Sequence, residues 1–240
     1  MVQIKSSKYL DFLSQFGVGG AHPGGLSLTM EVLKNESIDE TSHVLDVGCG
    51  TGQTAAYLTS RYDAKVTGID IHPIMVEKAK KRMKKDQLPV EILQSSIENV
   101  PLQDAQFDLV LSESVLSFAN ASVALKEIYR LLKSGGRFIA IEMTINRPLD
   151  KTEETDLQQF YEFQSLLTEK DWIHLFEQTG FQHIHIHPQP SQQQDNAVLE
   201  DYHFSESIEP ETFEVMEQHF EKVLKYQGIL DYRIFTCTKG

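Results

Sequence analysis

An apolar run that ends in a glycine-rich turn, at residues 44–52, constrains the fold of this chain more than any other feature. The run predicts a buried strand, the turn predicts the start of a helix, and the next apolar run ends in Asp70. Glycines allow positive φ and let a ligand approach the backbone closely, and a carboxylate at the end of the second strand can accept hydrogen bonds from both hydroxyls of a ribose. The sequence therefore predicts an α/β fold that binds a nucleoside cofactor.

Two cofactor classes are compatible with this turn. Residues 50–55 match the dinucleotide pattern G-x-G-x-x-A, and Asp70 follows at about the spacing that this pattern requires. In that interpretation Asp46 would lie inside a parallel strand that is buried on both faces, where an unpaired carboxylate is costly. If the strand instead ends near Val47, Asp46 stands at its carboxyl edge and can meet an amino group or a sulfonium, whereas it would repel a pyrophosphate. These residues favour S-adenosylmethionine, and NAD with a dehydrogenase activity is the alternative.

Further segments follow the turn in a fixed order and spacing. They are residues 66–70 (VTGID), 96–101 (SIENVP), 107–110 (FDLV) and 127–137 (EIYRLLKSGGR). Together with residues 44–52 they resemble the class I S-adenosylmethionine-dependent methyltransferases of the broad ubiquinone/menaquinone-methyltransferase-like type, the methyltransferase type 11 family. The resemblance is strong over residues 40–145. It implies methyl transfer from S-adenosylmethionine and a doubly wound, mostly parallel, Rossmann-like sheet of seven strands whose last strand is antiparallel.

Two residues depart from the pattern of this family. Ser96 stands where the family usually has an acid that receives the adenine amino group, and Ser134 stands where it has proline. A serine hydroxyl can still accept that hydrogen bond, and Ser134 only loosens a turn. Ile71, beside Asp70, and Ile97, after Ser96, are placed to sandwich the adenine, with ordinary packing as the alternative.

The predicted cofactor-binding residues cluster around the ends of the first four strands. The glycines and acids are expected to touch the cofactor, and a tight turn with a capping acid is the alternative. Cys49 has no histidine near it in sequence, so it is expected to pack within the turn. The predicted set is Asp46, Gly48, Cys49, Gly50, Gly52, Asp70, Ile71, Ser96, Ile97 and Ser112.

Residues 112–114 (Ser-Glu-Ser) follow the fourth predicted strand, where the sheet faces the transferred methyl group. Many amino-group methyltransferases carry Asn/Asp-Pro-Pro-Tyr or Phe at this point. Its absence here counts against the exocyclic amines of DNA bases, or glutamine, as acceptors. Glu113 is a candidate general base or orienting acceptor, and a solvated or salt-bridged side chain is the alternative.

His22 lies in a loop of high glycine content, Gly-Gly-Ala-His-Pro-Gly-Gly. An imidazole titrates near neutrality and can remove a proton from a hydroxyl, while N–H groups of such a loop can meet the methionine carboxylate of the cofactor. A polar residue that caps the chain before Pro23 is the alternative. His22 and Glu113 are thus the predicted catalytic residues.

No metal site is predicted. His183, His185 and His187 alternate along a predicted strand, but Ile184 and Ile186 between them indicate a half-exposed strand with the isoleucines turned inward. Nothing after the fourth strand supplies the clustered carboxylates and amide that magnesium-dependent catechol methyltransferases use.

The chain is predicted to form a single domain with an N-terminal helical lid (1–40), a cofactor-binding core (41–143), and cap helices with the last two strands (144–240). Alternation of strands and helices in the core predicts parallel strands with crossover helices. One helix is expected to end at Lys133, closed by Gly135 and Gly136, and another to span residues 152–167. Other helices are expected at 8–16, 26–34, 169–179 and 211–227, and strands at 44–47, 66–70, 90–93, 107–111, 138–143, 184–187 and 232–238, with a turn-rich loop at 188–196.

Composition limits the partners. The formal net charge of -13 disfavours nucleic acids and anionic membrane surfaces, because phosphate binding relies on clustered Lys and Arg. The basic run at 78–85 is interpreted as a solvated helix face, with an RNA-docking patch as the alternative. The two cysteines lie far apart in the sequence. We find neither the apolar core of a signal peptide nor an apolar run long enough to span a membrane. These features predict a reduced, cytoplasmic protein without a membrane partner, as a monomer or homodimer.

The sequence therefore predicts a methyltransferase that acts on a small-molecule acceptor, at oxygen or carbon. A protein or RNA methyltransferase and a noncatalytic S-adenosylmethionine-binding protein are the alternatives. Aromatic residues at helical spacing, including Phe160, Tyr161, Phe163 and Trp172, are interpreted as core rather than as site residues.

Overall fold

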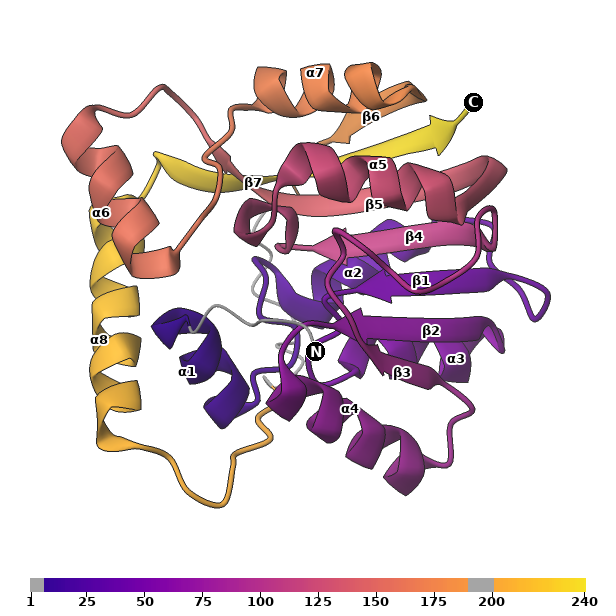
Figure 1. The fold of residues 1–240 in the computed structure, drawn as a ribbon, viewed down its shortest axis with the longest axis horizontal. Helices are drawn as coiled ribbons and strands as arrows, with labels where there is room; N and C mark the ends of the chain where they lie inside the picture. The colour runs from indigo at the N-terminus through magenta and orange to yellow at the C-terminus, as the bar shows by residue number, and fades with distance from the viewer. Residues whose placement is uncertain (1–6, 190–200) are drawn as a thin grey trace.

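The computed structural model describes residues 7–189 and 201–240. These residues form a seven-stranded sheet with the strand order β3-β2-β1-β4-β5-β7-β6 (Figure 1). Neighbouring strands pair in parallel except at β7, which is antiparallel to both β5 and β6. This arrangement confirms the predicted doubly wound α/β fold. The strands are β1 (His43–Val47), β2 (Lys65–Asp70), β3 (Glu91–Gln94), β4 (Phe107–Glu113), β5 (Leu132–Ile145), β6 (Phe181–His187) and β7 (Leu230–Lys239).

Helices cover both faces of this sheet. They are α1 (Lys8–Phe16), α2 (Gly25–Leu33), α3 (Gln53–Tyr62), α4 (Pro73–Asp86), α5 (Ala121–Leu131), α6 (Lys151–Tyr161), α7 (Glu169–Thr179) and α8 (Pro210–Lys225), with a short 3-10 helix η1 (Leu116–Phe118). Successive strand residues send their side chains to opposite faces. Val44 and Leu109 pack under α2, α3 and α4, whereas Leu45 and Val110 pack under α5 and α7. The strands are thus buried on both faces, as parallel strands usually are.

Helices α1, α6 and α8 stand together beyond the carboxyl ends of the parallel strands (Figure 1). They share one apolar cluster, in which Tyr9 and Phe12 of α1 meet Val215 of α8. Backbone hydrogen bonds tie the chain near residue 201 to the loop after α1, because the Gly19 N–H donates to the Asp201 carbonyl at 2.9 Å. The two ends of the chain therefore build one cap over the edge where ligands bind in open α/β sheets. The function of residues 1–40 as a lid stays a prediction.

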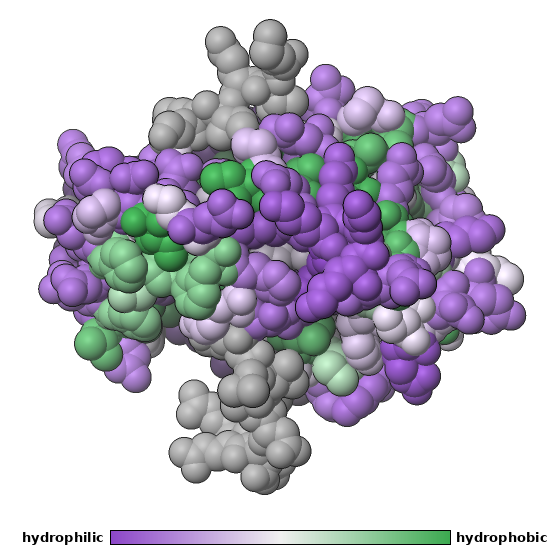
Figure 2. All heavy atoms as spheres, turned by 90° about the horizontal axis from the view of Figure 1, so that it is seen from below, coloured by the Kyte–Doolittle hydropathy of each residue, from purple (hydrophilic) through white to green (hydrophobic). Residues whose placement is uncertain are grey.

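The cap carries an apolar surface on α8 and on the residues that precede it. Figure 2 shows apolar side chains gathered on the side of the molecule where α8 lies. Large exposed apolar side chains on this side are Phe204, Phe213, Phe220, Val223 and Leu224.

Helix α5 ends two residues earlier than the sequence predicts, so Gly135 and Gly136 lie inside β5 and do not close a helix. The pairing of β4 with β5 shifts register between Phe107 and Leu109, and the two glycines fall in the resulting bulge. A Cβ on Gly136 would lie 2.8 Å from the Lys133 carbonyl oxygen, which explains a glycine at this point.

Two further expectations on the C-terminal part are wrong. Helix α6 ends at Tyr161 and does not reach residue 167, because Glu162 adopts the left-handed conformation with φ 60°. Strand β6 has an irregular register between Gln182 and His185, with His183 at φ 50°. Ile184 packs against the core as predicted, whereas Ile186 is exposed although it pairs with the buried Phe235. The predicted loop at 188–196 lies mostly outside the described residues.

The basic face of α4 is only partly solvated. Lys81 pairs with Glu77 in solvent, as expected of a surface helix. Lys78, in contrast, is half-buried and donates to the carbonyl oxygens of Ser14 at 2.6 Å and Gln15 at 3.1 Å. This lysine therefore attaches α4 to the end of α1, which corrects the prediction for that position.

Trp172 of α7 is fully buried in the core. Its indole N–H donates to the Met143 carbonyl at 3.1 Å. It is confirmed as a core residue. Among the described residues, no helix has the length and hydropathy that a bilayer crossing would need.

Candidate active site

A cavity of about 1000 Å³ lies between the carboxyl edge of the sheet and the cap. This volume is at the upper end of the range of small-molecule sites, which is about 300–1,000 Å³. One part of its lining comes from the ends of β1, β2, β3 and β4 and is polar. The other part comes from α1, η1, α6 and α8 and is largely aromatic. We call the second part the aromatic chamber.

The turn after β1 depends on glycine at two positions for different reasons. Gly48 has φ 67°, and a Cβ there would lie only 2.3 Å from a methyl carbon of Val115. Gly50 has φ 53°, and a Cβ there would have nothing within 4 Å. Gly50 thus borders open space in the cavity, while Gly48 is packed against the turn after β4. Gly52 is not among the lining residues, since it caps α3 and faces Met83.

Gly48→Ala is expected to lower the free energy of unfolding by about 1–3 kcal/mol more than Gly135→Ala. Both glycines have positive φ, but a Cβ on Gly135 would meet nothing within 4 Å. The comparison therefore separates the cost of the clash with Val115 from the cost of a positive φ in alanine, which both variants share. Urea unfolding of the two variants measures the difference, and equal losses would show that Val115 moves aside.

Asp70, at the end of β2, is buried and held by two backbone N–H groups. Its Oδ2 accepts from Gly50 at 2.9 Å and its Oδ1 accepts from His72 at 2.7 Å. Burial raises the pKa of this carboxyl, and the two N–H groups oppose that shift. Each oxygen keeps a further lone pair, so the side chain can still accept hydrogen bonds from a ligand.

Asp46, at the end of β1, is almost fully buried and lines the cavity. Its Oδ2 has no hydrogen-bond partner within residues 7–189 and 201–240. Burial, and then the nearby carboxylates of Glu113 and Asp70, raise the pKa of Asp46 well above its ordinary value. A cationic ligand group beside Asp46 would relieve this unfavourable state.

The predicted adenine-binding residues lie where the sequence places them. Ile71, Ser96 and Ile97 all line the cavity, and the Ser96 hydroxyl accepts from the Glu98 N–H at 3.2 Å. Cys49 also lines it, and burial raises the pKa of its thiol well above the usual value, so the thiol is unreactive.

Ser112 is not in the cavity wall. It is fully buried inside β4, and its hydroxyl donates to Glu142 Oε1 at 2.7 Å. Strand β4 extends through Glu113, so residues 112 and 113 belong to the strand and do not follow it. Because strand side chains alternate, Glu113 faces the cavity and Ser112 faces the opposite side.

The two predicted catalytic residues form a pair. His22 Nε2 lies 3.2 Å from Glu113 Oε1, and both side chains are nearly buried. Glu113 also accepts from the Thr29 hydroxyl and, at 2.9 Å, from the Thr54 hydroxyl. The other ring nitrogen of His22 lies 3.2 Å from the Pro23 carbonyl oxygen. The glycine loop, α2, α3 and β4 thus jointly fix this pair.

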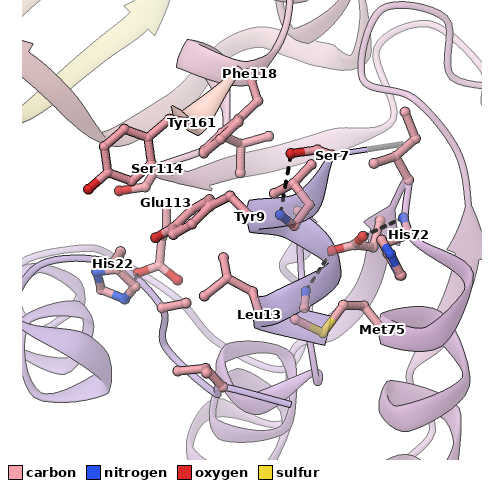
Figure 3. A pocket seen from close by; sticks show the side chains of 18 of the residues that line it. Ser7, Tyr9, Leu13, His22, His72, Met75, Glu113, Ser114, Phe118 and Tyr161 are labelled. Atoms are coloured by element: carbon pink, nitrogen blue, oxygen red, sulfur yellow. Dashed lines mark hydrogen bonds and ion pairs between the residues drawn. The ribbon is translucent and has the colours of Figure 1, made fainter. Parts of the chain in front are cut away.

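Figure 3 shows Glu113 between His22 and Tyr9, with Ser114 beside it. Ser114 has φ 57°, a conformation that costs energy in a residue with a side chain. Its buried hydroxyl has no partner in the described part of the chain. Since Ser114 lines the cavity, it is a further polar group available to a ligand.

The aromatic chamber was not predicted from the sequence. Tyr9 and Tyr161 meet edge to face with ring centroids 4.8 Å apart, and Phe163 stacks on Tyr161 at 4.8 Å. The Tyr161 hydroxyl lies 3.0 Å from His219 Nδ1, and burial lowers the pKa of this histidine. Tyr161 and Phe163 therefore line the cavity as well as packing in the cap, which corrects their interpretation as core alone. The amphipathic pattern of α1 and α8 was a signal for this, but it does not show what the two helices face.

Glu142 in β5 supports the end of β4, which carries Glu113, and the turn that follows it. It is fully buried, and besides Ser112 it accepts from the N–H groups of Val115 at 3.3 Å and Leu116 at 3.2 Å. Burial raises its pKa to about 7 against the effect of these hydrogen bonds.

The raised pKa of Glu142 predicts a pH-dependent stability. A carboxyl whose pKa is higher in the folded state stabilises the fold below its unfolded value of 4.5, and this contribution is lost as the pH rises through about 7. The full difference is on the order of 3 kcal/mol. Glu142→Gln should therefore flatten the decline of the melting temperature between about pH 5 and pH 8. If the melting temperature declines equally in both proteins, the raised pKa of Glu142 is not the cause of the decline.

Within the described residues no three metal-ligating side chains converge. Of the three alternating histidines, His187 is hydrogen bonded to the Thr236 hydroxyl at 2.8 Å. The absence of a metal from the reaction stays a prediction.

Comparisons with known proteins identify the family. Residues 45–140 match the model of the methyltransferase domain. An uncharacterised methyltransferase of Bacillus subtilis, YodH, is 37% identical over 233 residues, which are 97% of this chain and 100% of that protein. This chain belongs to the methyltransferase family. Its cofactor is S-adenosylmethionine, and it is an enzyme that transfers the methyl group.

Two other relatives show how wide this family is. The O-methyltransferase cnsE of Penicillium expansum is 32% identical to this methyltransferase, over 68% of this chain and 60% of that protein. The phosphoethanolamine N-methyltransferase 2 of Haemonchus contortus, solved with S-adenosyl-L-methionine, superposes with a TM-score of 0.75 at 18% identity, over 96% of this chain and 56% of that chain. The second likeness shows the shared fold. The methyltransferases similar to this one therefore include both oxygen and nitrogen acceptors.

Proposed function

We propose that this methyltransferase methylates an oxygen or a carbon of a small molecule that binds in the aromatic chamber. The observation that carries the proposal is the His22–Glu113 pair, which lines the same cavity as the glycine turn and the aromatic walls. S-adenosylmethionine, when bound, supplies an activated methyl group with its own leaving group. The protein then has to align the acceptor and, where necessary, remove its proton.

The strand ends fit the cofactor, and the proposal assigns a role to each. Asp46 has an unpartnered buried oxygen that suits a cationic group of the ligand. Asp70 is placed to accept from the ribose hydroxyls, and its two backbone hydrogen bonds hold it in orientation. The open space at Gly50 allows the cofactor to lie against the backbone. The residues proposed to hold the adenine are Ile71, Ser96 and Ile97.

The pair can receive a proton from an acceptor hydroxyl. Thr29 and Thr54 bind both oxygens of Glu113, so the carboxylate is fixed in orientation before an acceptor arrives. A hydroxyl that reaches Glu113 can lose its proton to the carboxylate or, through it, to Nε2 of His22. The resulting oxygen anion is the atom that attacks the methyl group. General base catalysis of this kind contributes about 10²- to 10⁴-fold.

The cap supports a small molecule as the acceptor. Helices α1 and α8 cover the carboxyl edge of the sheet, so an acceptor has to enter the cavity to reach the site. A macromolecular substrate would instead need an open surface beside the site on which to place its reacting side chain. The chain also has Ser-Glu-Ser where many amino-group enzymes have their proline motif. Nitrogen is nevertheless a second candidate acceptor atom, since relatives include N-methyltransferases.

An activity screen tests the proposal. The protein is incubated with S-adenosylmethionine carrying an isotopic label in its methyl group, with phenols, alcohols, acidic carbon compounds and amines, and, separately, with RNA and total protein. We expect label in a small molecule at oxygen or carbon. Label only in RNA or protein would support the macromolecular alternative, and cofactor binding without turnover on any class would support a noncatalytic protein.

A further inference from the structure

The permanently charged side chains on the described lining of the cavity are all acidic. Among the described lining residues there is neither a lysine nor an arginine. The acidic residues that line it are Asp46, Asp70, Glu98, Glu113, Glu162 and Asp231. Among the described lining residues, a negatively charged ligand would therefore meet carboxylates and no permanent cation.

Two cationic side chains on the surrounding elements, Arg82 and Lys222, are bound to other partners. Arg82 of α4 donates to the Thr51 carbonyl at 2.8 Å and pairs with Asp201 at 2.5 Å. Lys222 of α8 forms an ion pair with Asp156 of α6. These cations stabilise the cap and the glycine turn, so turning one into the cavity would break an existing interaction.

The histidines of the cavity do not supply a free cation either. His22 is paired with Glu113, and His72 Nε2 lies 3.1 Å from Asp11 Oδ1. His219 lies among aromatic rings, and burial lowers its pKa, which disfavours its cationic form. A proton on His22 or His72 would already be balanced by its own carboxylate partner.

The apolar lining continues to the protein surface. Phe204, Phe220 and Val223 both line the cavity and are exposed, with 59%, 59% and 49% of their surface accessible. An acceptor that enters past these residues would leave water for an apolar environment. Burial of an anion in such an environment without a paired cation is costly.

We propose that the aromatic chamber takes an apolar acceptor that carries no phosphate or carboxylate group. The inference rests on the proposed function, because it assumes that the acceptor binds in this chamber. It deepens that function by excluding anionic acceptors, which the methyltransferase fold by itself admits. The methyl acceptor is then an uncharged or cationic apolar molecule, and a hydroxyl on it would be the group that reaches Glu113.

Two probes of the same ring system test the inference by calorimetry at pH 7, with S-adenosylhomocysteine present. One is 2-naphthol, which is uncharged, and the other is 2-naphthoate, which is an anion. We expect 2-naphthol to bind and 2-naphthoate to bind at least about 10-fold more weakly, because its carboxylate would be buried without a partner. Equal or tighter binding of 2-naphthoate would overturn the proposal, and so would no binding of 2-naphthol.

A charge variant with a matched control locates the effect in the chamber. Met216 of α8 lines the cavity and is half-buried, and lysine and glutamine have similar lengths. Met216→Lys should strengthen the binding of 2-naphthoate about 10-fold, whereas Met216→Gln should not. Unchanged affinity for S-adenosylhomocysteine shows that each variant is folded. If both variants, or neither of them, lose the preference for 2-naphthol over 2-naphthoate, the result would contradict the proposal.

The binding assay needs no turnover, so its failure is distinguishable from failure of the proposed function. If 2-naphthol binds selectively but no oxygen or carbon compound is methylated, the charge preference stands and the reaction assignment fails. If an anionic compound proves to be methylated at oxygen, the reaction assignment stands and the charge preference fails.

Discussion

His22→Ala should lower kcat by about 10²- to 10⁴-fold while the Kd for S-adenosylhomocysteine stays nearly constant. The imidazole lies 3.2 Å from Glu113 Oε1. Its removal takes away the group that receives the proton from the Glu113 carboxylate. Glu113→Gln should give a loss of similar size, because the amide keeps the shape of the side chain and cannot take up the proton. Steady-state turnover with the acceptor found by the activity screen measures both effects.

His174→Ala is the control for the loss of a histidine, since His174 is exposed on α7 and is hydrogen bonded to Gln178 of its own helix. Its turnover should equal that of the unmodified protein. A different pattern for His22→Ala, with weaker cofactor binding and an unchanged kcat at saturation, would show that His22 shapes the cofactor site and is not a base. If the acceptor atom is a carbon that is already acidic, the reaction depends less on the base. The decrease of kcat at low pH would then disappear.

Asp70→Ala should raise the Kd of both S-adenosylmethionine and S-adenosylhomocysteine about 10- to 150-fold. This range corresponds to a hydrogen bond to a charged group, which contributes about 1.5–3 kcal/mol. The variant also leaves the N–H groups of Gly50 and His72 without their acceptor. Calorimetric titration of the folded variant measures the change.

Asp70→Asn separates the two effects, because its amide oxygen can still accept from one backbone N–H group while the charge is lost. We expect it to lie between the unmodified protein and Asp70→Ala. Asp108→Ala is the surface control, since Asp108 pairs with Lys133 and does not line the cavity. An unchanged affinity in the folded Asp70→Ala protein would remove Asp70 from the cofactor site.

The sequence was a good guide to the sheet because parallel strands are buried on both faces and appear as short apolar runs. The glycine turn and the strand-end acids were found for a similar reason, since each has a backbone or charge requirement that few residues meet. Ser112 was misplaced because the sequence alone did not show that β4 runs through Glu113. The predicted strand ended two residues too early, at residue 111, and the alternation along residues 112 and 113 decides which side chain faces the cavity.

The acceptor side of the cavity was much less predictable. Tyr9, Tyr161 and His219 come from three helices that are far apart in sequence, and nothing local shows that they meet. The contact between His22 and Glu113 is likewise non-local, although each was chosen separately. Glu142 was missed altogether, yet a single acid inside the apolar run of β5 was a visible signal of a buried polar network.

The position of β7 between β5 and β6 has a consequence for the synthesis of the protein. Chains leave the ribosome from the N-terminus at about 5–20 residues per second, so residues 230–239 emerge after the other six strands of the sheet. Until then β5 has no neighbour on one side, and β6 cannot join the sheet. A nascent chain can therefore assemble the glycine turn early, but it completes its acceptor chamber only after α8 and β7 have emerged. Deletion of residues 230–239 should for this reason act on the whole sheet and not only on its edge.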